Sequence, residues 1–591
     1  MQKKIRRKDK VRIRKGNNMA DRIKIPNLKK QFEAEEYTDV KQLLKRSCEK
    51  YGEDNAYVIK HKNGRDISYE YITYKRYYQM ITAFCNGLAE SGYKGKRLAI
   101  IGNNCLEWTI GYFAQLCGNG VVIPLDKGLP YEELTSSLNR SYADVLLFDK
   151  AHLALIREIQ ESGECDGLEY ICINDVEGYQ TLEALIEKGE KAERDYFAEY
   201  VIDPDATNII LFTSGTTSLA KAVQLTHRNV ASNIYALNIT EDIRRGDRSM
   251  AFLPYHHTFG IMAQIIMLSA GVMTAYCDGL KYIQKNIVEY KLTVFVCVPL
   301  LIESIYKKIM ATVRKEGLEK KVKFGVALSR FLLKFGIDVR RKLFKDIHEQ
   351  LGGNLRFVIS GASAIDPEAL KGLSDFGIFA FQGYGMTETS PVLAAENHVE
   401  SRAGSIGKAI PGVELCVDVP NEEGIGELIA RGPNVMKGYF ENQEATDEIL
   451  IDGWLHTGDL ARVDEDGFVY ICGRKKNVIV LKNGKNVYPE ELETLIANLP
   501  YVEENMVYGE PKKHDGDETD LALVAKIVYR PEAMQELYGL TDPGEIEQKI
   551  KTDIDVINTQ VPVYKQLLRV HVTDEPMIKT TTGKVKRYAN K

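Results

Sequence analysis

The sequence predicts an α/β protein with a large N-terminal part of several subdomains, whose sheets are rich in parallel strands, and a smaller α+β C-terminal domain. Helical and buried-strand patterns alternate from about residue 70 to residue 360, which implies parallel βαβ units. Short strands and tight turns follow Gly412 and indicate a small β-rich subdomain, and the charge density rises beyond Gly473. Because 591 residues are too many for one core, we expect an N-terminal domain over residues 20–472 and a C-terminal domain over 473–591.

Composition limits the classes of function. Hydrophobic residues make up 44% of the chain and charged residues 27%, as in ordinary globular proteins of the cytoplasm. The net charge of -5 gives no reason to expect nucleic acid as a partner. Ten cysteines are scattered without a C-x-x-C pair, which favours a reducing compartment and argues against zinc. We therefore expect a cytoplasmic protein.

Two segments could have pointed to a membrane or a targeting signal. Residues 1–19 are basic and lack the apolar core of a signal peptide. The run Lys3–Lys15 could bind nucleic acid or an anionic membrane, but we expect a disordered tail, and Met19 could be the natural start. The most apolar stretch, Phe259–Cys277, is interrupted by polar and small residues. It fits a buried helix running into a buried strand, so we predict no membrane span.

The first half of the chain gives the elements in order. A strand precedes an amphipathic helix, with apolar residues at helical spacing and Gly92 as its end. The stripe on this helix consists of Tyr74, Tyr78, Ile81, Phe84 and Leu88. The following predicted elements are a strand at 97–101, a helix at 106–118, a strand at 120–124, a helix at 130–140 and a strand at 143–148.

The second half continues the alternation and then changes. A buried strand, Ile209–Phe212, leads into a polar loop, after which Thr226 or Asn229 can cap a helix. A strand at 293–298 is followed by a long, basic and mostly helical insertion over 307–353 and a strand at 355–360. In the C-terminal domain we predict strands at 504–508 and 522–528 and helices at 490–499 and 543–559.

The polar loop after Phe212 has the composition of a polyphosphate cradle. It consists of Thr213, Ser214, Gly215, Thr216, Thr217 and Ser218, with Lys221 close behind. Hydroxyls and backbone N–H groups donate to phosphate oxygens, and a lysine supplies positive charge. The ordinary P-loop pattern is absent, because the spacing from Gly215 to Lys221 is one residue too long and no Ser or Thr follows the lysine. Taken alone, the loop could also be a solvated turn.

Six further motifs follow in chain order. They are SGASAIDPE (360–368), YGMTETSP (384–391), GELIARGPNVMKGY (426–439), DGWLHTGDLA (452–461), GRKKNVIVLKNGKNVYPEELE (473–493) and PMIKTTTGK (576–584). Together with TSGTT-x(3)-K, their order and spacing resemble the acyl-adenylate-forming superfamily, the AMP-binding enzymes, over about residues 40–590. Within it the chain is most similar to long-chain fatty acid–CoA ligases, because of GRKKNVIVLKNGKNVYPEELE, GYGMTETSP and the helical insertion before LGGNLRFVISGAS.

The resemblance implies an ATP-dependent ligase with Mg²⁺ and coenzyme A. Such enzymes join a carboxylate to AMP with release of pyrophosphate, and a thiol then displaces the AMP. For this chain the implied substrate is a medium- to long-chain fatty acid. The acceptor could instead be the phosphopantetheine thiol of an acyl carrier protein. A peripheral membrane contact and a homodimer are left open, and a catalytically dead binding protein is the alternative from another class.

The resemblance also implies roles by motif position. Thr213, Ser214, Gly215, Thr216, Thr217 and Lys221 should hold the β- and γ-phosphates. Thr387 should contact the α-phosphate, and Glu388 should be the Mg²⁺ ligand. Tyr384 should stack on adenine beside Gly361 and Ala362, with Gly383 in the same nucleotide site. Asp459 and Arg474 should bind the ribose.

Two lysines are implied to act from the C-terminal domain, which the resemblance implies is mobile. Lys584 should bridge the attacking carboxylate and the α-phosphate, and Lys476 should lie at the hinge about which that domain rotates. His256 and His257 should line the acyl pocket. Adjacent histidines on a strand point in different directions, so we do not expect them to bind zinc together. In the cradle Ser218, Ala220 and Ala222 replace the family's Gly, Pro and Gly, from which we expect altered nucleotide affinity.

Overall fold

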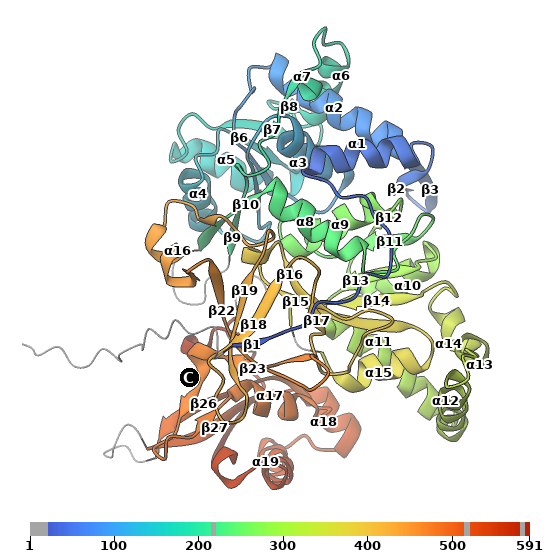
Figure 1. Cartoon of the computed structure of the whole chain (residues 1–591), viewed down its shortest axis with the longest axis vertical. Coiled ribbons are helices and arrows are strands. Elements are labelled where there is room, and N and C mark those ends of the chain that lie inside the picture. Colours follow the sequence, from blue (N-terminus) through green and yellow to red (C-terminus); the bar gives the residue numbers. More distant parts are fainter. Residues whose placement is uncertain (1–21, 214–219, 364, 513–519, 580–584, 591) are drawn as a thin grey trace, which may run out of the picture.

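The structure is a computed structural model that describes residues 22–213, 220–363, 365–512, 520–579 and 585–590. Its large part contains four sheets, and a smaller α+β unit follows at the C-terminal end, at the bottom of Figure 1. The predicted α/β class is confirmed, with parallel strands in three of the four large sheets. The predicted basic tail, residues 1–19, lies outside the described residues.

The largest sheet has eight strands in the order β20-β10-β9-β5-β4-β6-β7-β8. From β9 to β8 neighbouring strands are parallel, as the alternation predicted. Its strands are β4 (Leu98–Ile101), β5 (Val122–Leu125), β6 (Val145–Phe148), β7 (Glu169–Cys172), β8 (Gln180–Thr181), β9 (Thr207–Thr213), β10 (Lys221–Thr226) and β20 (Gly438–Tyr439). The helices along it include α3 (Leu106–Gly118), α4 (Tyr131–Arg140), α5 (Leu153–Ser162), α6 (Leu182–Glu190) and α8 (His227–Asn238).

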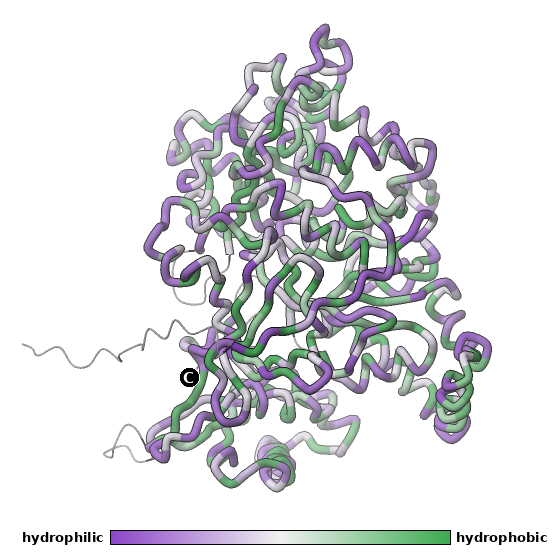
Figure 2. Tube along the Cα trace, in the orientation of Figure 1, coloured by the Kyte–Doolittle hydropathy of each residue, from purple (hydrophilic) through white to green (hydrophobic). Residues whose placement is uncertain are grey.

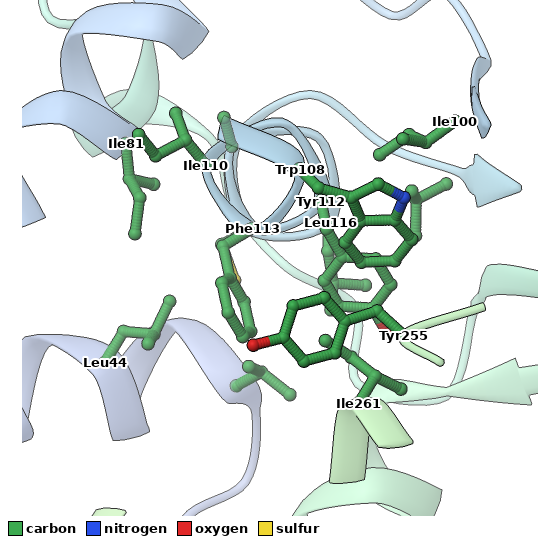
Figure 3. Packing of buried hydrophobic residues seen from close by; sticks show 14 of the residues in the cluster. Leu44, Ile81, Ile100, Trp108, Ile110, Tyr112, Phe113, Leu116, Tyr255 and Ile261 are labelled. Atoms are coloured by element: carbon green, nitrogen blue, oxygen red, sulfur yellow. The ribbon is translucent and has the colours of Figure 1, made fainter. Parts of the chain in front are cut away.

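Helix α3 lies in the middle of the largest hydrophobic core. Every residue of α3 except Glu107 is buried. Trp108 stacks on Tyr112 with ring centroids 5.5 Å apart and lies 5.4 Å from Tyr255. Figure 3 shows these rings between α3 and the start of α9 (Thr258–Ser269), with Leu44 and Ile81 on the neighbouring helices α1 (Val40–Tyr51) and α2 (Tyr74–Glu90). Burial of so many aromatic rings fixes α3 against the sheet.

Two mixed sheets lie beside the first. One has the order β11-β12-β2-β3, and the other has β13-β14-β15-β16-β17. The strands are β2 (Asn55–Asn63), β3 (Asp66–Thr73), β11 (Arg248–Ala251), β12 (Met273–Tyr276), β13 (Val294–Cys297), β14 (Phe357–Ser360), β15 (Phe379–Gly385), β16 (Val392–Ala395) and β17 (Lys408–Ala409). Helix α9 (Thr258–Ser269) runs into β12, so the predicted helix-to-strand reading of the most apolar stretch is confirmed. None of the described helices has the length and apolarity needed to span a bilayer.

The helical insertion lies between β13 and β14. It consists of α11 (Pro299–Lys315), α12 (Glu319–Leu333), α13 (Arg340–Leu343) and α14 (Lys345–Gln350). Figure 1 shows α12 and α13 at the outer edge of the molecule, beyond α11 and α15 (Pro367–Asp375).

The predicted β-rich subdomain is a sheet in the order β1-β18-β19-β22-β21, with β23 paired to β22. Its strands are β18 (Glu414–Asp418), β19 (Gly426–Arg431), β21 (Leu450–Ile451), β22 (Trp454–Val463) and β23 (Val469–Arg474). Its edge strand, β1 (Arg22–Lys24), was not predicted and lies far from the others in sequence. Arg22 Nε donates to Asp418 Oδ1 at 2.8 Å and fixes this edge.

The C-terminal unit has a core of its own. A three-stranded sheet, β26 (Val502–Pro511), β27 (Leu521–Tyr529) and β28 (Arg569–Thr573), packs against α17 (Pro489–Ala497) and α19 (Pro543–Thr559). These elements agree with the predicted strands and helices to within three residues at each end. In Figure 2 the sheet and α19 show alternating hydrophilic and hydrophobic residues, as expected for elements with one buried face.

One strand next to the cradle was not predicted. Residues Lys221–Thr226 form β10, which pairs antiparallel with β9. Of the two predicted caps, Thr226 is the N-cap of α8, and it forms a capping box with Asn229. A six-residue strand with a lysine, a glutamine and a threonine carries too few apolar positions to stand out in the sequence.

Candidate active site

The first group of predicted residues lies at the loop end of the hairpin β9–β10. Thr213 ends β9 and Lys221 begins β10, and the two are paired in register. The Thr213 hydroxyl donates to the Lys221 carbonyl at 3.3 Å. The hairpin therefore brings the first hydroxyl and the lysine of the predicted cradle side by side. Ser214, Gly215, Thr216 and Thr217 lie outside the described residues.

Lys221 is connected to Glu388 through Tyr439. The Lys221 ammonium lies 4.7 Å from the centre of the Tyr439 ring, a cation–π distance. The Tyr439 hydroxyl donates to Glu388 Oε1 at 2.8 Å. Burial and the adjacent Glu388 carboxylate raise the pKa of Tyr439 well above its usual value, so the hydroxyl keeps its proton and stays a donor. Strand β20, which carries Tyr439, pairs with β10, and this pairing places the ring between the two charges.

Glu388 and Thr387 lie on a short 3₁₀ turn, Thr387–Thr389, just after β15. Glu388 is buried, and its backbone carbonyl accepts the N–H of Met436 at 2.8 Å. Among the described residues only Tyr439 donates to its carboxylate, which leaves lone pairs available for a cation. A buried carboxylate with one fixed oxygen suits Mg²⁺, which takes oxygen ligands and binds through one or two carboxylates plus phosphates.

Tyr384, Asp459 and Arg474 form a second connected group. The Tyr384 hydroxyl donates to Asp459 Oδ2 at 2.5 Å, and Arg474 Nε lies 2.7 Å from Asp459 Oδ1. The residues come from β15, β22 and β23, and Asp459 is the register partner of Arg474. Burial and the Asp459 carboxylate raise the pKa of Tyr384 above its usual value. The structure thus brings together three residues that the resemblance assigned to adenine and ribose, and orients the tyrosine ring by its hydroxyl.

Gly361 and Ala362 follow strand β14, and Gly383 lies near the end of the neighbouring parallel strand β15. Ser360 and Gln382 are register partners, so Gly361 and Gly383, one residue further on, lie at the same edge of the sheet. Ala362 has a φ of 74°, in the left-handed region. A Cβ atom on Gly361 would lie 3.0 Å from the ring of Phe259, which is tighter than ordinary contact. Small residues at the carboxyl ends of parallel strands leave room for a ligand at that edge.

His256 and His257 differ from the expectation. They do not lie on a strand; they precede α9, whose N-cap is His257. Their ring centroids are 4.3 Å apart, and their ring nitrogens and a carboxylate oxygen of Asp126 all lie within 4.8 Å of one another. The prediction that the two side chains point in different directions is therefore wrong, because the alternation of a strand does not apply to this turn.

The turn formed by His256 and His257, which we call the histidine turn, contacts the other groups through Thr258. Thr258, the first residue of α9, approaches the Thr387 hydroxyl at 3.5 Å. His256 Nε2 lies 3.3 Å from Asp126 Oδ1, and Asp126 directly follows β5. The role of the histidine pair in lining an acyl pocket stays a prediction. A small cavity nearby, between β11 and α9, is lined mainly by apolar residues, among them Leu253, Ala263 and Met267.

Of the two lysines assigned to the C-terminal domain, the structure describes only Lys476. Lys476 is exposed on the short turn Lys475–Asn477, directly after β23. Next to it, Lys475 Nζ lies 2.8 Å from Glu427 Oε2. Lys584 lies outside the described residues, so its predicted role stays untested.

Sequence reasoning missed Tyr439, Thr258 and Asp126. Tyr439 closes the motif GELIARGPNVMKGY, and its position at the end of a motif was a usable signal. Thr258 directly follows the two histidines, which was also visible. Asp126 carried no signal, because only the fold brings the end of β5 to the histidine turn.

Comparison with known proteins supports one family. The family model of the AMP-binding enzyme matches residues 44–440, and that of the AMP-binding enzyme C-terminal domain matches residues 476–590. A long-chain-fatty-acid–CoA ligase of Mycobacterium bovis is 29% identical over 543 residues, covering 86% of this chain and 88% of the relative. Long-chain-fatty-acid–CoA ligase 5 of Mus musculus is 30% identical and covers 75% and 69%, respectively.

Solved structures share the fold. An anthranilate CoA ligase in complex with anthranoyl-AMP superposes with a TM-score of 0.72 at 20% identity, covering 94% of this chain and 96% of that chain. The o-succinylbenzoate coenzyme A synthetase of Bacillus subtilis, in complex with ATP and a magnesium ion, gives a TM-score of 0.69 at 21% identity and covers 93% and 98%.

Proposed function

The chain belongs to the family of AMP-binding enzymes, and we propose that it is an ATP-dependent ligase that joins a medium- to long-chain fatty acid to coenzyme A. The observation that carries the proposal is the connection Lys221–Tyr439–Glu388 beside the group Tyr384–Asp459–Arg474. One group offers charge for a polyphosphate and its metal ion. The other offers an aromatic ring and a carboxylate for a nucleoside.

In the first step a carboxylate oxygen of the fatty acid attacks the α-phosphorus of ATP. The bond from that phosphorus to the bridging oxygen breaks, and pyrophosphate leaves with the electron pair. Both partners are anionic, so the site must offset the repulsion. We assign Lys221 and the cradle to the β- and γ-phosphates and Thr387 to the α-phosphate, because Thr387 lies between Glu388 and the histidine turn. Asp459 and Arg474 are assigned to the ribose.

We assign Mg²⁺ to Glu388. When bound, the ion supplies positive charge to the phosphate oxygens. Tyr439 keeps one carboxylate oxygen in place by donating to it, and its ring contacts the Lys221 ammonium. Burial of Glu388 lowers the local dielectric and strengthens its interaction with a cation.

In the second step the thiol sulfur attacks the acyl carbonyl carbon, AMP leaves, and the thiol proton passes to solvent. Coenzyme A is the favoured acceptor, because the relatives that match most of the chain are CoA ligases. We propose that residues 473–591 form a mobile domain that turns about Lys476 between the two steps. The exposure of Lys476 directly after β23 supports this, since β23 is still tied to the β-rich sheet. Ten free cysteines support a reducing, cytoplasmic location.

The test is a screen of pyrophosphate release over straight-chain acids of graded length, with CoA and acyl carrier protein as alternative acceptors. We expect activity to rise with length and to favour acids of roughly ten or more carbons, since each buried methylene adds about 0.8 kcal/mol. CoA should be the better acceptor. Equal rates with acetate, benzoate and palmitate would contradict the proposed substrate class, and a preference for carrier protein would contradict the acceptor.

A further inference from the structure

Helix α12 in the insertion presents large apolar side chains to solvent. Phe324, Phe331 and Phe335 are 70%, 56% and 67% exposed. Their spacing of seven and four residues places them on one side of the helix and of the turn that follows it. Phe331 and Phe335 pack edge to face with ring centroids 5.2 Å apart. We call these three residues the phenylalanine face.

The opposite side of α12 is packed, so the helix cannot turn to hide the phenylalanine face. Val322 and Val326 pack against the hydrophobic core of the five-stranded sheet. Gly325 is buried, and a Cβ atom there would lie 3.3 Å from the Phe344 ring. Arg330 forms a two-pronged ion pair with Asp375 of α15. The orientation of α12 is therefore fixed by contacts on its inner side.

Lysines surround the phenylalanine face. Lys320, Lys321, Lys323 and Lys334 are exposed, and no described carboxylate lies within ion-pair distance of any of them. Residues 319–345 contain nine lysines and arginines against two acidic residues, in a chain whose net charge is -5. The positive charge is thus concentrated where the apolar side chains are exposed.

This pairing of features selects among partners. Exposed aromatic rings beside lysines are typical of helices that lie in the interface of an anionic bilayer, where rings enter the boundary and ammonium groups meet phosphates. Protein interfaces also use aromatic residues, but lysine is depleted in them. Nucleic acid would use the charge and leave three phenylalanines without a role.

We propose that the phenylalanine face and its four lysines bind the surface of an anionic lipid membrane. Figure 1 places α12 at the outer edge of the molecule, so a flat surface can reach it without displacing another element. The inference does not depend on the proposed reaction, because it concerns a surface outside the candidate site.

The experiment is sedimentation of the full chain with vesicles. The probes are vesicles of phosphatidylcholine alone and of phosphatidylcholine mixed with phosphatidylglycerol, each at low and high salt. The test variant replaces the phenylalanine face, F324S/F331S/F335S. The matched control, V201S/L280S/V563S, removes three side chains that are at least as exposed on other elements. Melting temperatures of both variants verify that they fold.

The parent chain and the control should bind the anionic vesicles, more weakly at high salt, and the test variant should lose at least tenfold in affinity. A charge-reversed variant, K320E/K321E/K323E, should lose the preference for anionic vesicles. Binding of the test variant equal to that of the parent, or failure of the parent to bind, would overturn the inference. So would a vesicle-free dimer, seen by analytical ultracentrifugation, that the test variant abolishes, since the face would then join two copies of this chain.

Discussion

Tyr439 shows how one side chain can serve two charges at once. Its ring faces the Lys221 ammonium and its hydroxyl holds Glu388, so removing the hydroxyl separates the two contacts. A phenylalanine at this position would keep the ring and lose only the hydrogen bond. A comparison of substitutions at positions 439 and 388 can therefore distinguish orientation of the carboxylate from its charge.

Glu388→Gln should lower the rate of acyl-AMP formation by on the order of a hundredfold or more, because glutamine keeps the size and loses the charge that a cation needs. Tyr439→Phe should cost roughly ten- to a hundredfold, the scale of one hydrogen bond to a charged group. The measurement is pyrophosphate release against Mg²⁺ concentration. An E388Q enzyme with the parent's rate and the parent's Mg²⁺ dependence would show that Glu388 is not a metal ligand.

A second residue, the buried Glu241, makes the free energy of unfolding depend on pH. It is buried after α8, and its Oε1 has no hydrogen-bond partner among the described residues. Burial chiefly, with Glu396 and Asp242 nearby, raises its pKa from 4.5 to about 8. Between these values the folded chain keeps a proton that the unfolded chain releases, so the free energy of unfolding should fall as pH rises from about 4.5 to about 8.

Glu241→Gln should remove that loss, which is on the order of a few kcal/mol over the whole window. The slope of unfolding free energy against pH, from urea denaturation, should be flatter for E241Q than for the parent. Glu33→Gln, at an exposed position, is the control and should leave the slope unchanged. Parallel slopes for the parent and E241Q would mean that Glu241 is not protonated in the folded chain.

Among the elements, the join between β10 and α8 ties the cradle to the core. Thr226 Oγ1 accepts the N–H of Asn229 at 3.1 Å, and Asn229 Oδ1 accepts the N–H of Thr226 at 2.9 Å. Thr226→Ala should lower the unfolding free energy by about 1 kcal/mol, as for a lost N-cap. Because Lys221 begins the same strand, the KM for ATP should also rise. Thr181→Ala removes an equivalent cap at α6, away from the site, and should leave that KM unchanged. An equal rise in the KM for ATP in both variants would show that the cap of α8 does not act on the cradle.

Helices and strands that are buried on one face or on all sides were predicted well from the sequence. Helix α3 was recovered residue for residue, because its continuous apolar run is bounded by polar residues. Strand β10 was missed, because it follows a polar loop and carries too few apolar positions to stand out. The turn of His256 and His257 was misread as a strand, because two aromatic polar residues next to an apolar run fit either structure.

For the candidate site, motif order selected the residues, and the fold supplied their partners. Tyr384 and Asp459 are 75 residues apart in sequence, and nothing local shows that one donates to the other. Asp126 and His256 are likewise joined only by the position of β5 beside the histidine turn. Sequence alone therefore names candidate residues of the site but does not show which of them contact each other.

At the scale of the whole molecule, the proposed rotation predicts a separation of the two half-reactions. Lys584→Ala should slow acyl-AMP formation, because the transition state loses stabilisation of several kcal/mol, the scale of a direct charge contact. It should keep much of its ability to convert supplied acyl-AMP and CoA into thioester. The two half-reactions are assayed apart on the same variant, with E388Q as the comparison that also spares the second step. If K584A slows both steps equally, Lys584 does not leave the site between them.

Strand β1 has a consequence for how the protein is made. Arg22 leaves the ribosome well before its partner Asp418, which is 396 residues later in the chain. At a synthesis rate of about 5–20 residues per second, that interval is roughly 20 to 80 seconds. Throughout it, β1 lacks its partner strand, because β18 has not yet been translated, and this edge of the β-rich sheet can form only after β18 has left the ribosome.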